Sequence, residues 1–224
     1  MRGAVRHEYE SLAPRYDRRW AAYIAATATA TLSRLPGDLP AAGRFLDVAC
    51  GTGVLLEQLF SRFGDARAFA GIDVAPAMLR VARGRLPLRV GLAVGEAERL
   101  PVASSCFDLV LSMNAWHCFR RPEQALREAH RVLVPGGRLL VTDWCADFAL
   151  VRGRWWALRL AGRPLGTLFS TSSLAAALLH AGFGDVRVER HRASWSWGMM
   201  TAVARASGAA ERRVATTRLP PRDR

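Results

Sequence analysis

The chain has 224 residues, close to the upper end of one domain and short for two. Half of the residues are hydrophobic and 23% are charged, which supports a buried core and excludes global disorder. The formal net charge of +13 raises nucleic acid or an anionic membrane as a partner. The chain has no lysine, however, and its arginines are spread over its whole length, so we expect a solvated arginine-rich surface and no nucleic-acid partner.

The N-terminal segment and the cysteines bear on the compartment. Residues Met1 to Arg19 are charged and carry no apolar stretch, so we do not expect them to form a signal peptide. The mild stretch Ala21–Leu32 is well short of the roughly 20 residues of a membrane span. The four cysteines lack the spacing of a zinc site and the density of a disulfide-rich domain: Cys50, Cys106, Cys118 and Cys145. We expect a cytoplasmic protein without a structural metal.

Strand and helix patterns alternate through the middle of the chain. In chain order they are strand Arg44–Ala49, helix Val54–Phe63, strand Ala68–Asp73, helix Pro76–Gly84, strand Leu88–Val94, strand Phe107–Met113, helix Pro122–Leu133, a Pro-Gly-Gly turn at 135–137 and strand Arg138–Asp143. This alternation predicts parallel strands joined by right-handed crossovers.

The pattern changes after Asp143. A Trp- and Arg-rich segment at 144–170 precedes helix Thr171–Ala181, strand Val186–His191 and strand Trp195–Ala204. Because no helix separates these two strands, we expect an antiparallel pair at the sheet edge. The predicted fold is α/β, a seven-stranded, mostly parallel, doubly wound sheet with helices on both faces. It forms one domain, residues 1–206, with a helical element at 9–35 outside the sheet and a disordered basic tail at 207–224.

A glycine-containing loop lies where the first strand gives way to the first helix. It reads Asp47-Val48-Ala49-Cys50-Gly51-Thr52-Gly53. Glycines let the backbone approach a ligand closely, and a helix N-terminus offers free N–H groups. Asp73 ends the second strand, where a carboxylate can accept hydrogen bonds from the ribose hydroxyls of a nucleoside cofactor. The loop, the acid and the strand-helix alternation together indicate a nucleoside cofactor site.

Four stretches in this order resemble the class I S-adenosylmethionine-dependent methyltransferases, and most of all the branch of ubiquinone and menaquinone biosynthesis. They are FLDVACGTG, GIDVAPAML, GEAERLPVASSCFDLVLSMNAWHCF and RVLVPGGRLLVTDW. The stretch YESLAPRYDRRW is similar to the N-terminal element of that branch, so the resemblance covers residues 9 to 204. It implies a Rossmann-like sheet, S-adenosylmethionine as cofactor and a small-molecule acceptor. The first glycine of the family's loop is Ala49 here, a replacement that the family tolerates.

The resemblance also implies roles for individual residues. Asp47 would orient the loop and the methionine amino group, and the loop residues Ala49, Gly51 and Gly53 would back the methionyl and ribose parts. Asp73 would hold the ribose. The residues implied around the adenine, the methionyl end and the lid over the cofactor are Val74, Met78, Glu96, Ala97, Asn114 and Tyr16.

Three other functions agree less well with the sequence. A nicotinamide enzyme usually has a third loop glycine, whereas Gly53 is followed by Val54-Leu55-Leu56. A nucleic-acid (RNA) methyltransferase fits the charge, but the fourth strand ends in SMNAW without the Asn/Asp-Pro-Pro-aromatic motif that grips a flipped base. A non-catalytic scaffold is disfavoured by the intact loop and Asp73.

Methyl transfer needs positioning, a dry pocket and, for a hydroxyl or carbon acid, a base. His117, in the loop after the fourth strand, and Asp143, at the tip of the fifth, are the two candidates. Their alternative roles are a pocket-wall histidine and a loop-fixing carboxylate.

The segment Val151–Arg163 interleaves tryptophans and arginines. We expect it to cap an acceptor pocket, and binding at a membrane interface stays open. The tryptophans expected near the acceptor are Trp116, Trp144, Trp155 and Trp156. The acceptor is therefore expected to be hydrophobic, and aromatic or quinone-like.

Overall fold

The computed structural model describes residues 2–208, and most of the predicted tail at 207–224 lies outside the described residues. The helices are α1 (Arg2–Leu12), α2 (Tyr16–Leu32), α3 (Val54–Phe63), α4 (Pro76–Arg85), α5 (Pro122–Val132), α6 (Ala149–Leu160) and α7 (Thr171–His180). The strands are β1 (Arg44–Val48), β2 (Ala68–Asp73), β3 (Gly91–Val94), β4 (Phe107–Met113), β5 (Leu133–Trp144), β6 (Phe183–Ser194) and β7 (Trp197–Ala206). Short 3-10 turns lie at Ala13–Arg15, Gly64–Ala66 and Trp116–Cys118.

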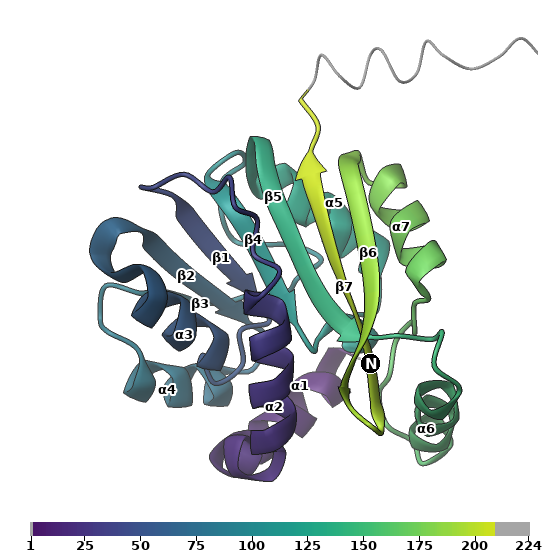
Figure 1. The fold of residues 1–224 in the computed structure, drawn as a ribbon. Helices are drawn as coiled ribbons and strands as arrows, with labels where there is room; N and C mark the ends of the chain where they lie inside the picture. Colours follow the sequence, from purple (N-terminus) through teal and green to yellow (C-terminus); the bar gives the residue numbers. More distant parts are fainter. Residues whose placement is uncertain (1, 209–224) are drawn as a thin grey trace, which may run out of the picture.

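The strands form one seven-stranded sheet in the order β3-β2-β1-β4-β5-β7-β6. The first five strands in this order are parallel, and β7 is antiparallel to both β5 and β6 (Figure 1). The predicted mostly parallel sheet with an antiparallel edge pair is thereby confirmed. Strand order reverses between β1 and β4, so a crevice opens at the carboxyl ends of these two strands.

Alternation of side chains along the strands builds two cores, one on each face. On β4, Val110 faces the core that contains Leu126 of α5 and Leu178 of α7. Its neighbours Leu109 and Leu111 face the core formed with α3 and α4. Because successive strand residues point to opposite faces, an uninterrupted apolar run can be buried on both sides only when helices cover both. The helices on both faces are confirmed.

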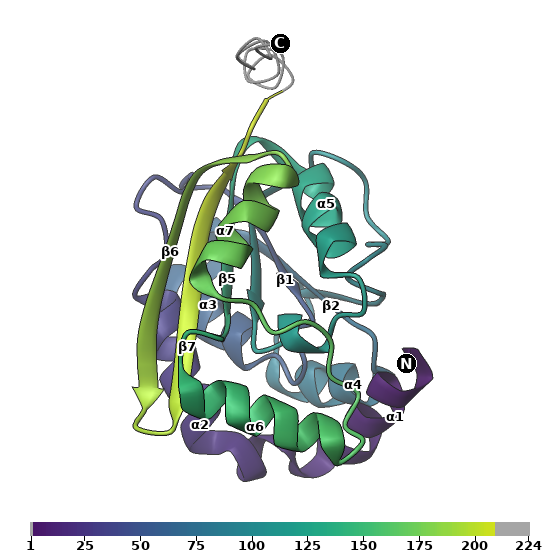
Figure 2. The ribbon, with the colours of Figure 1, turned by 90° about the vertical axis from the view of Figure 1, so that its right-hand side faces the viewer.

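Three helices gather at the end of the sheet to which the parallel strands point. Figures 1 and 2 show α1, α2 and α6 at this end, with α6 packed against the start of β7. The predicted helical stretch at 9–35 is two helices, broken by the turn at Ala13–Arg15. Pro14 lies in this turn, where its ring and missing N–H favour a helix start over a helix interior.

Five of the seven predicted strands have other boundaries in the structure: those predicted at 44–49, 88–94, 138–143, 186–191 and 195–204. The strand predicted at Leu88–Val94 begins only at Gly91, because the backbone N–H of Val90 bonds the carbonyl of Pro87 in a turn. The turn predicted at 135–137 lies inside β5, which starts at Leu133 and shifts register against β4 between its partners Phe107 and Leu109. This register shift accommodates the extra residues of the Pro-Gly-Gly segment within β5.

Gly166 ties the segment after α6 to the turn at Trp116–Cys118. Its N–H donates to the carbonyl of His117 at 2.7 Å, and a Cβ there would lie 2.1 Å from the carbonyl oxygen of Phe119. We expect Gly166→Ala to lower the free energy of unfolding by about 1–3 kcal/mol, because backbone atoms must move. Urea denaturation measures this. Gly84→Ala, in α4 with no atom within 4 Å of its Cβ, is the matched control and should not destabilise.

Candidate active site

The loop after β1 is bent into an unusual backbone conformation. Ala49, Gly51 and Gly53 all have positive φ, at 61°, 53° and 80°. An alanine held in this left-handed backbone region costs about 1–3 kcal/mol of strain, so Ala49 is a strained position. The N–H groups of Ala49 and Cys50 both bond the carbonyl of Ile72, so the loop is held against β2. Gly53 does not line the cavity described below. A Cβ there would lie 2.9 Å from Leu86, so its glycine also serves the packing of α3 against α4.

Two buried carboxylates stand at the carboxyl ends of β1 and β2. Asp73 accepts the Gly51 N–H on one oxygen and the Ala75 N–H on the other, both at 2.8 Å. Burial raises its pKa, although these backbone hydrogen bonds oppose the rise. Asp47 is 2% exposed and its Oδ1 has no hydrogen-bond partner within residues 2–208. Burial, and then repulsion by Asp73, hold the pKa of Asp47 well above its usual value.

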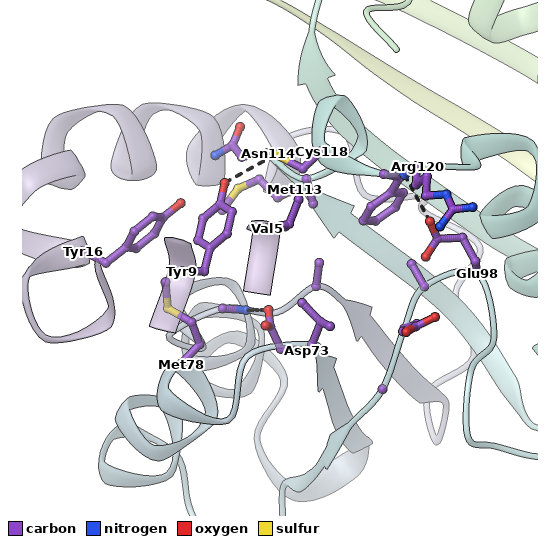
Figure 3. A pocket seen from close by; sticks show the side chains of 18 residues that line it. Val5, Tyr9, Tyr16, Asp73, Met78, Glu98, Met113, Asn114, Cys118 and Arg120 are labelled. Atoms are coloured by element: carbon purple, nitrogen blue, oxygen red, sulfur yellow. Dashed lines mark hydrogen bonds between the residues drawn. The ribbon is translucent and has the colours of Figure 1, made fainter. Parts of the chain in front are cut away.

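A cavity lies over these groups, between the strand ends and the N-terminal helices. Figure 3 shows Tyr9 and Tyr16 on one side of it and Asp73 and Met78 on the other. The predicted cofactor residues that line it are Tyr16, Ala49, Gly51, Asp73, Val74, Met78, Glu96, Ala97 and Asn114. Asp47 lines a small adjoining cavity together with Tyr16, Ala49, Gly51 and Asn114. The structure therefore brings together all the predicted cofactor residues except Gly53.

Several lining residues were missed by sequence reasoning. They are Val5, Tyr9, Glu98, Cys118 and Arg120. The Tyr9 hydroxyl lies 3.5 Å from the Cys118 Sγ, so α1 contacts the loop after β4 directly. Val5, Tyr9 and Leu12 recur at helical spacing, so the sequence indicates that they share one face of α1. The spacing does not indicate which part of the protein this face packs against.

A second cavity of about 340 Å³ adjoins the first, within the size range of small-molecule sites. The residues that line both cavities are Tyr9, Tyr16, Asn114 and Cys118. Its aromatic walls come from Trp20, Tyr23, Trp144 and Trp197. Of the tryptophans expected here, only Trp144 lines it. Trp116 is buried next to His117. Trp155 packs on the inner side of α6, and Trp156 of the same helix is 57% exposed.

His117 and Asp143 form a pair. The His117 Nδ1 lies 2.6 Å from the Asp143 Oδ1, and the His117 backbone N–H donates to Oδ2 at 3.0 Å. The imidazole lines the second cavity and stacks on Trp144, with centroids 4.1 Å apart and planes 7° apart. Burial is the largest single influence and lowers the pKa of His117, but the charges of Asp143 and Cys118 and the hydrogen bonds to both together outweigh it and leave that pKa well above the usual value.

Asp143 does not line the second cavity; it is 2% exposed and lies behind His117. Its Oδ1 also accepts the backbone N–H of Trp144 at 2.5 Å. The oxygens of Asp143 bond the loop and the imidazole and do not reach the cavity, so its role as a base toward the acceptor stays a prediction. Asp143 can orient His117 and favour one tautomer.

Asn114 links β4 to α2 through hydrogen bonds. Its Oδ1 accepts the Tyr23 hydroxyl at 2.7 Å, and its Nδ2 donates to the Thr27 hydroxyl at 2.8 Å. The indole N–H of Trp144 donates to the same Tyr23 oxygen at 2.8 Å. Because Asn114 lines both cavities, this network fixes part of their shared wall to α2 and to the end of β5.

Within residues 2–208 no group of three or more His, Cys, Asp or Glu side chains is arranged to hold a metal ion. In the same part of the chain, no helix has the length and hydropathy needed to cross a membrane.

Comparisons with known proteins agree with this geometry. Residues 46–141 match the family described as methyltransferase domain. The malonyl-[acyl-carrier protein] O-methyltransferase of Methylococcus capsulatus is 33% identical over 192 residues, 77% of this chain and 69% of that protein. The demethylmenaquinone methyltransferase of Deinococcus radiodurans is 35% identical over 155 residues, 63% of this chain and 60% of that protein.

The fold recurs in a solved structure. A methyltransferase from Thermotoga maritima superposes with a TM-score of 0.74 at 23% identity and covers 90% of this chain and 99% of its own. The matched family, the identity over three quarters of the chain and the carboxylates around the glycine loop lead to one conclusion. The chain belongs to the class I S-adenosylmethionine-dependent methyltransferases, close to the quinone-biosynthesis branch, and its cofactor is S-adenosylmethionine.

Proposed function

We propose that the enzyme methylates an oxygen or carbon of a small hydrophobic, aromatic or quinone-like acceptor. The observation that carries this proposal is the second cavity, which has aromatic walls, borders the cofactor cavity and is lined by His117. Aromatic side chains suit a flat apolar ligand, because they bury its faces at little cost in side-chain entropy. By their names, one relative acts on demethylmenaquinone and another on malonyl-[acyl-carrier protein], which supports a small acceptor group.

The residues around the first cavity suit the cofactor. A buried carboxylate oxygen without a partner, as at Asp47, is costly unless a donor reaches it, and the ammonium group of a methionyl moiety is such a donor. Asp73 keeps free lone pairs for ribose hydroxyls while its backbone bonds hold it in place. Val74 and Met78 offer apolar contact for an adenine, with Glu96 and Ala97 at the edge. When bound, S-adenosylmethionine supplies an electrophilic methyl group.

His117 is the proposed base. Its Nδ1 faces Asp143, so the ring offers Nε2 as the other nitrogen for the acceptor. Asp143 acts as a positioning residue that holds the ring and favours its protonated form after a proton has been taken up. The helices at 9–35 form the proposed lid, since Tyr16 lines both cavities. The segment 144–170 forms the acceptor-side cap, since Arg154, Leu158 and Leu165 line the second cavity.

We also propose that the enzyme works in the cytoplasm. Its four cysteines are free, which supports a reducing compartment.

Labelled cofactor tests the acceptor class. We expect purified enzyme to transfer labelled methyl groups into a small-molecule extract of the source organism and to yield an apolar aromatic or quinone-like product by mass analysis. Label found in RNA, and in no small molecule, would contradict the proposal.

Loss of the Asp73 carboxylate should weaken cofactor binding. Because hydrogen bonds to a charged group contribute about 1.5–3 kcal/mol, we expect Asp73→Ala to raise the Kd for S-adenosylmethionine about 10- to 100-fold in isothermal titration. Asp65→Ala is the matched control, since Asp65 is exposed and pairs with Arg89 on the surface. Equal affinities for the two variants would refute the role of Asp73.

The pH dependence of turnover tests the pair formed by His117 and Asp143. Because the carboxylate raises the pKa of His117, the neutral, basic ring accumulates only as pH rises through that raised pKa, and kcat/KM should increase over the same range. Asp143→Asn removes the negative charge, so the inflection should move to lower pH while the maximal rate falls.

Two histidine variants complete this test. His117→Gln should lower kcat by about 10²- to 10⁴-fold, the usual contribution of a general base. His180→Gln, at the exposed end of α7, is the control and should behave as wild type. An unchanged inflection in Asp143→Asn would show that the pair does not set the pH profile.

A further inference from the structure

Helix α6 carries apolar residues on two opposite faces. Val151, Trp155 and Leu158 point inward at helical spacing, and Val151 is 1% exposed against Trp144 and Met199. Eight positions of α6 are exposed: Arg152 and Arg159, and six that are not polar, Ala149, Leu150, Gly153, Trp156, Ala157 and Leu160. A surface helix of a soluble domain normally turns polar residues outward. We call these six residues the outer face of α6.

The three largest side chains of this face are exposed to an unusual degree. Leu150, Trp156 and Leu160 are 58%, 57% and 85% exposed. Trp195 is 81% exposed in the turn between β6 and β7, and this turn lies near the start of α6 (Figure 2). Arg154, in the middle of α6, stacks over Trp197 at 4.0 Å. Several large apolar side chains exposed on one helix face indicate an interaction site.

The charges on α6 itself are all positive: it carries Arg152, Arg154 and Arg159 and no aspartate or glutamate. Asp147 precedes the helix and bonds Thr171, and Glu8 pairs with Arg163 beyond the end of the helix. Arg152 and Arg159 are exposed on one flank of the outer face and Arg154 lies on the other. Within residues 2–208 none of these three makes an ion pair with a carboxylate. An apolar stripe with tryptophan, flanked by arginines, is the pattern of a helix that lies in a membrane interface.

We propose that the outer face of α6 docks on a lipid bilayer with anionic headgroups. The apolar side chains would enter the boundary between headgroups and acyl chains, while Arg152 and Arg159 reach the phosphates. The charge pattern favours this occupant over a second copy of the chain, because a symmetric dimer through α6 would bring like-charged arginines together.

Docking also has a consequence for the acceptor, and this step rests on the proposed function. The inward side of α6 lines the second cavity through Arg154 and Leu158, opposite Leu12 and Trp20 from the N-terminal helices. Seating α6 on the bilayer would hold this cavity next to the lipid. A hydrophobic acceptor dissolved in the membrane could then enter without crossing water. The sequence of this segment left a pocket cap and a membrane contact as alternatives. In the proposal both hold, because the inner face of α6 caps the cavity and its outer face contacts the membrane.

Co-sedimentation with vesicles tests the docking. We expect the wild-type protein to bind vesicles of phosphatidylcholine containing phosphatidylglycerol at least about tenfold more strongly than vesicles of phosphatidylcholine alone, and to lose this preference at high salt. Trp156→Glu with Leu160→Glu should lower binding to the anionic vesicles at least about tenfold. Arg152→Gln with Arg159→Gln should remove the preference for the anionic lipid.

The control pair is Leu88→Glu with Leu179→Glu, at leucines that are 89% and 59% exposed, outside α6. It changes charge and apolar exposure as much as the α6 pair and should bind vesicles as wild type does. Titration with S-adenosylmethionine reports folding of every variant, and single Leu160→Gln offers a milder change should the double variant fail to fold.

Three outcomes would overturn docking: no vesicle binding by the wild type, full binding by a folded α6 variant, or a wild-type dimer that the α6 substitutions turn into monomers. Vesicle binding needs neither cofactor nor acceptor. A protein that docks but methylates no apolar acceptor would therefore refute the proposed function and leave the docking intact.

Discussion

The hydrogen bond from the Gly51 N–H to the Asp73 carboxylate is the contact on which the site depends. It joins the loop after β1 to the end of β2 and holds Gly51 in the left-handed region, where glycine is free of steric cost. Gly51 of this loop lines the cavity, and the Asp47 Oδ1 has no hydrogen-bond partner among the described residues 2–208. The cofactor site is thus an arrangement of backbone and two carboxylates in which burial raises both carboxyl pKa values.

The acceptor side is built differently, from side chains of segments far apart in the chain. Tyr23 of α2, Asn114 after β4 and Trp144 at the end of β5 share hydrogen bonds, and His117 stacks on Trp144. The N-terminal helices and α6 close the cavity around these groups. Such a site is specified by the packing of the N-terminal helices and α6 onto one end of the sheet. This arrangement suits a fold that keeps its cofactor chemistry and varies its acceptor.

Sequence patterns placed most residues of the first cavity at neighbouring strand ends, because these residues lie at the ends of regular elements. Strand periodicity placed Asp47 and Asp73 at neighbouring carboxyl ends, and the topology of a parallel sheet then brought them together. Prediction was weaker where the backbone is irregular. The strand start at Gly91 and the bulged start of β5 depend on single turns and on register, which periodicity does not specify.

Local sequence patterns are enough to predict the sheet, the glycine loop and the resemblance to the family, because each depends on the spacing of residues close together in the chain. The folded chain was needed to show that Asp143 contacts the His117 ring, that Tyr9, Trp20 and Trp197 line the cavities, and that Trp156 faces outward. The spacing of Trp155 and Trp156 shows that they lie on different sides of a helix, but not which side the rest of the protein covers. Burial depends on what packs against an element, and only the folded chain specifies that.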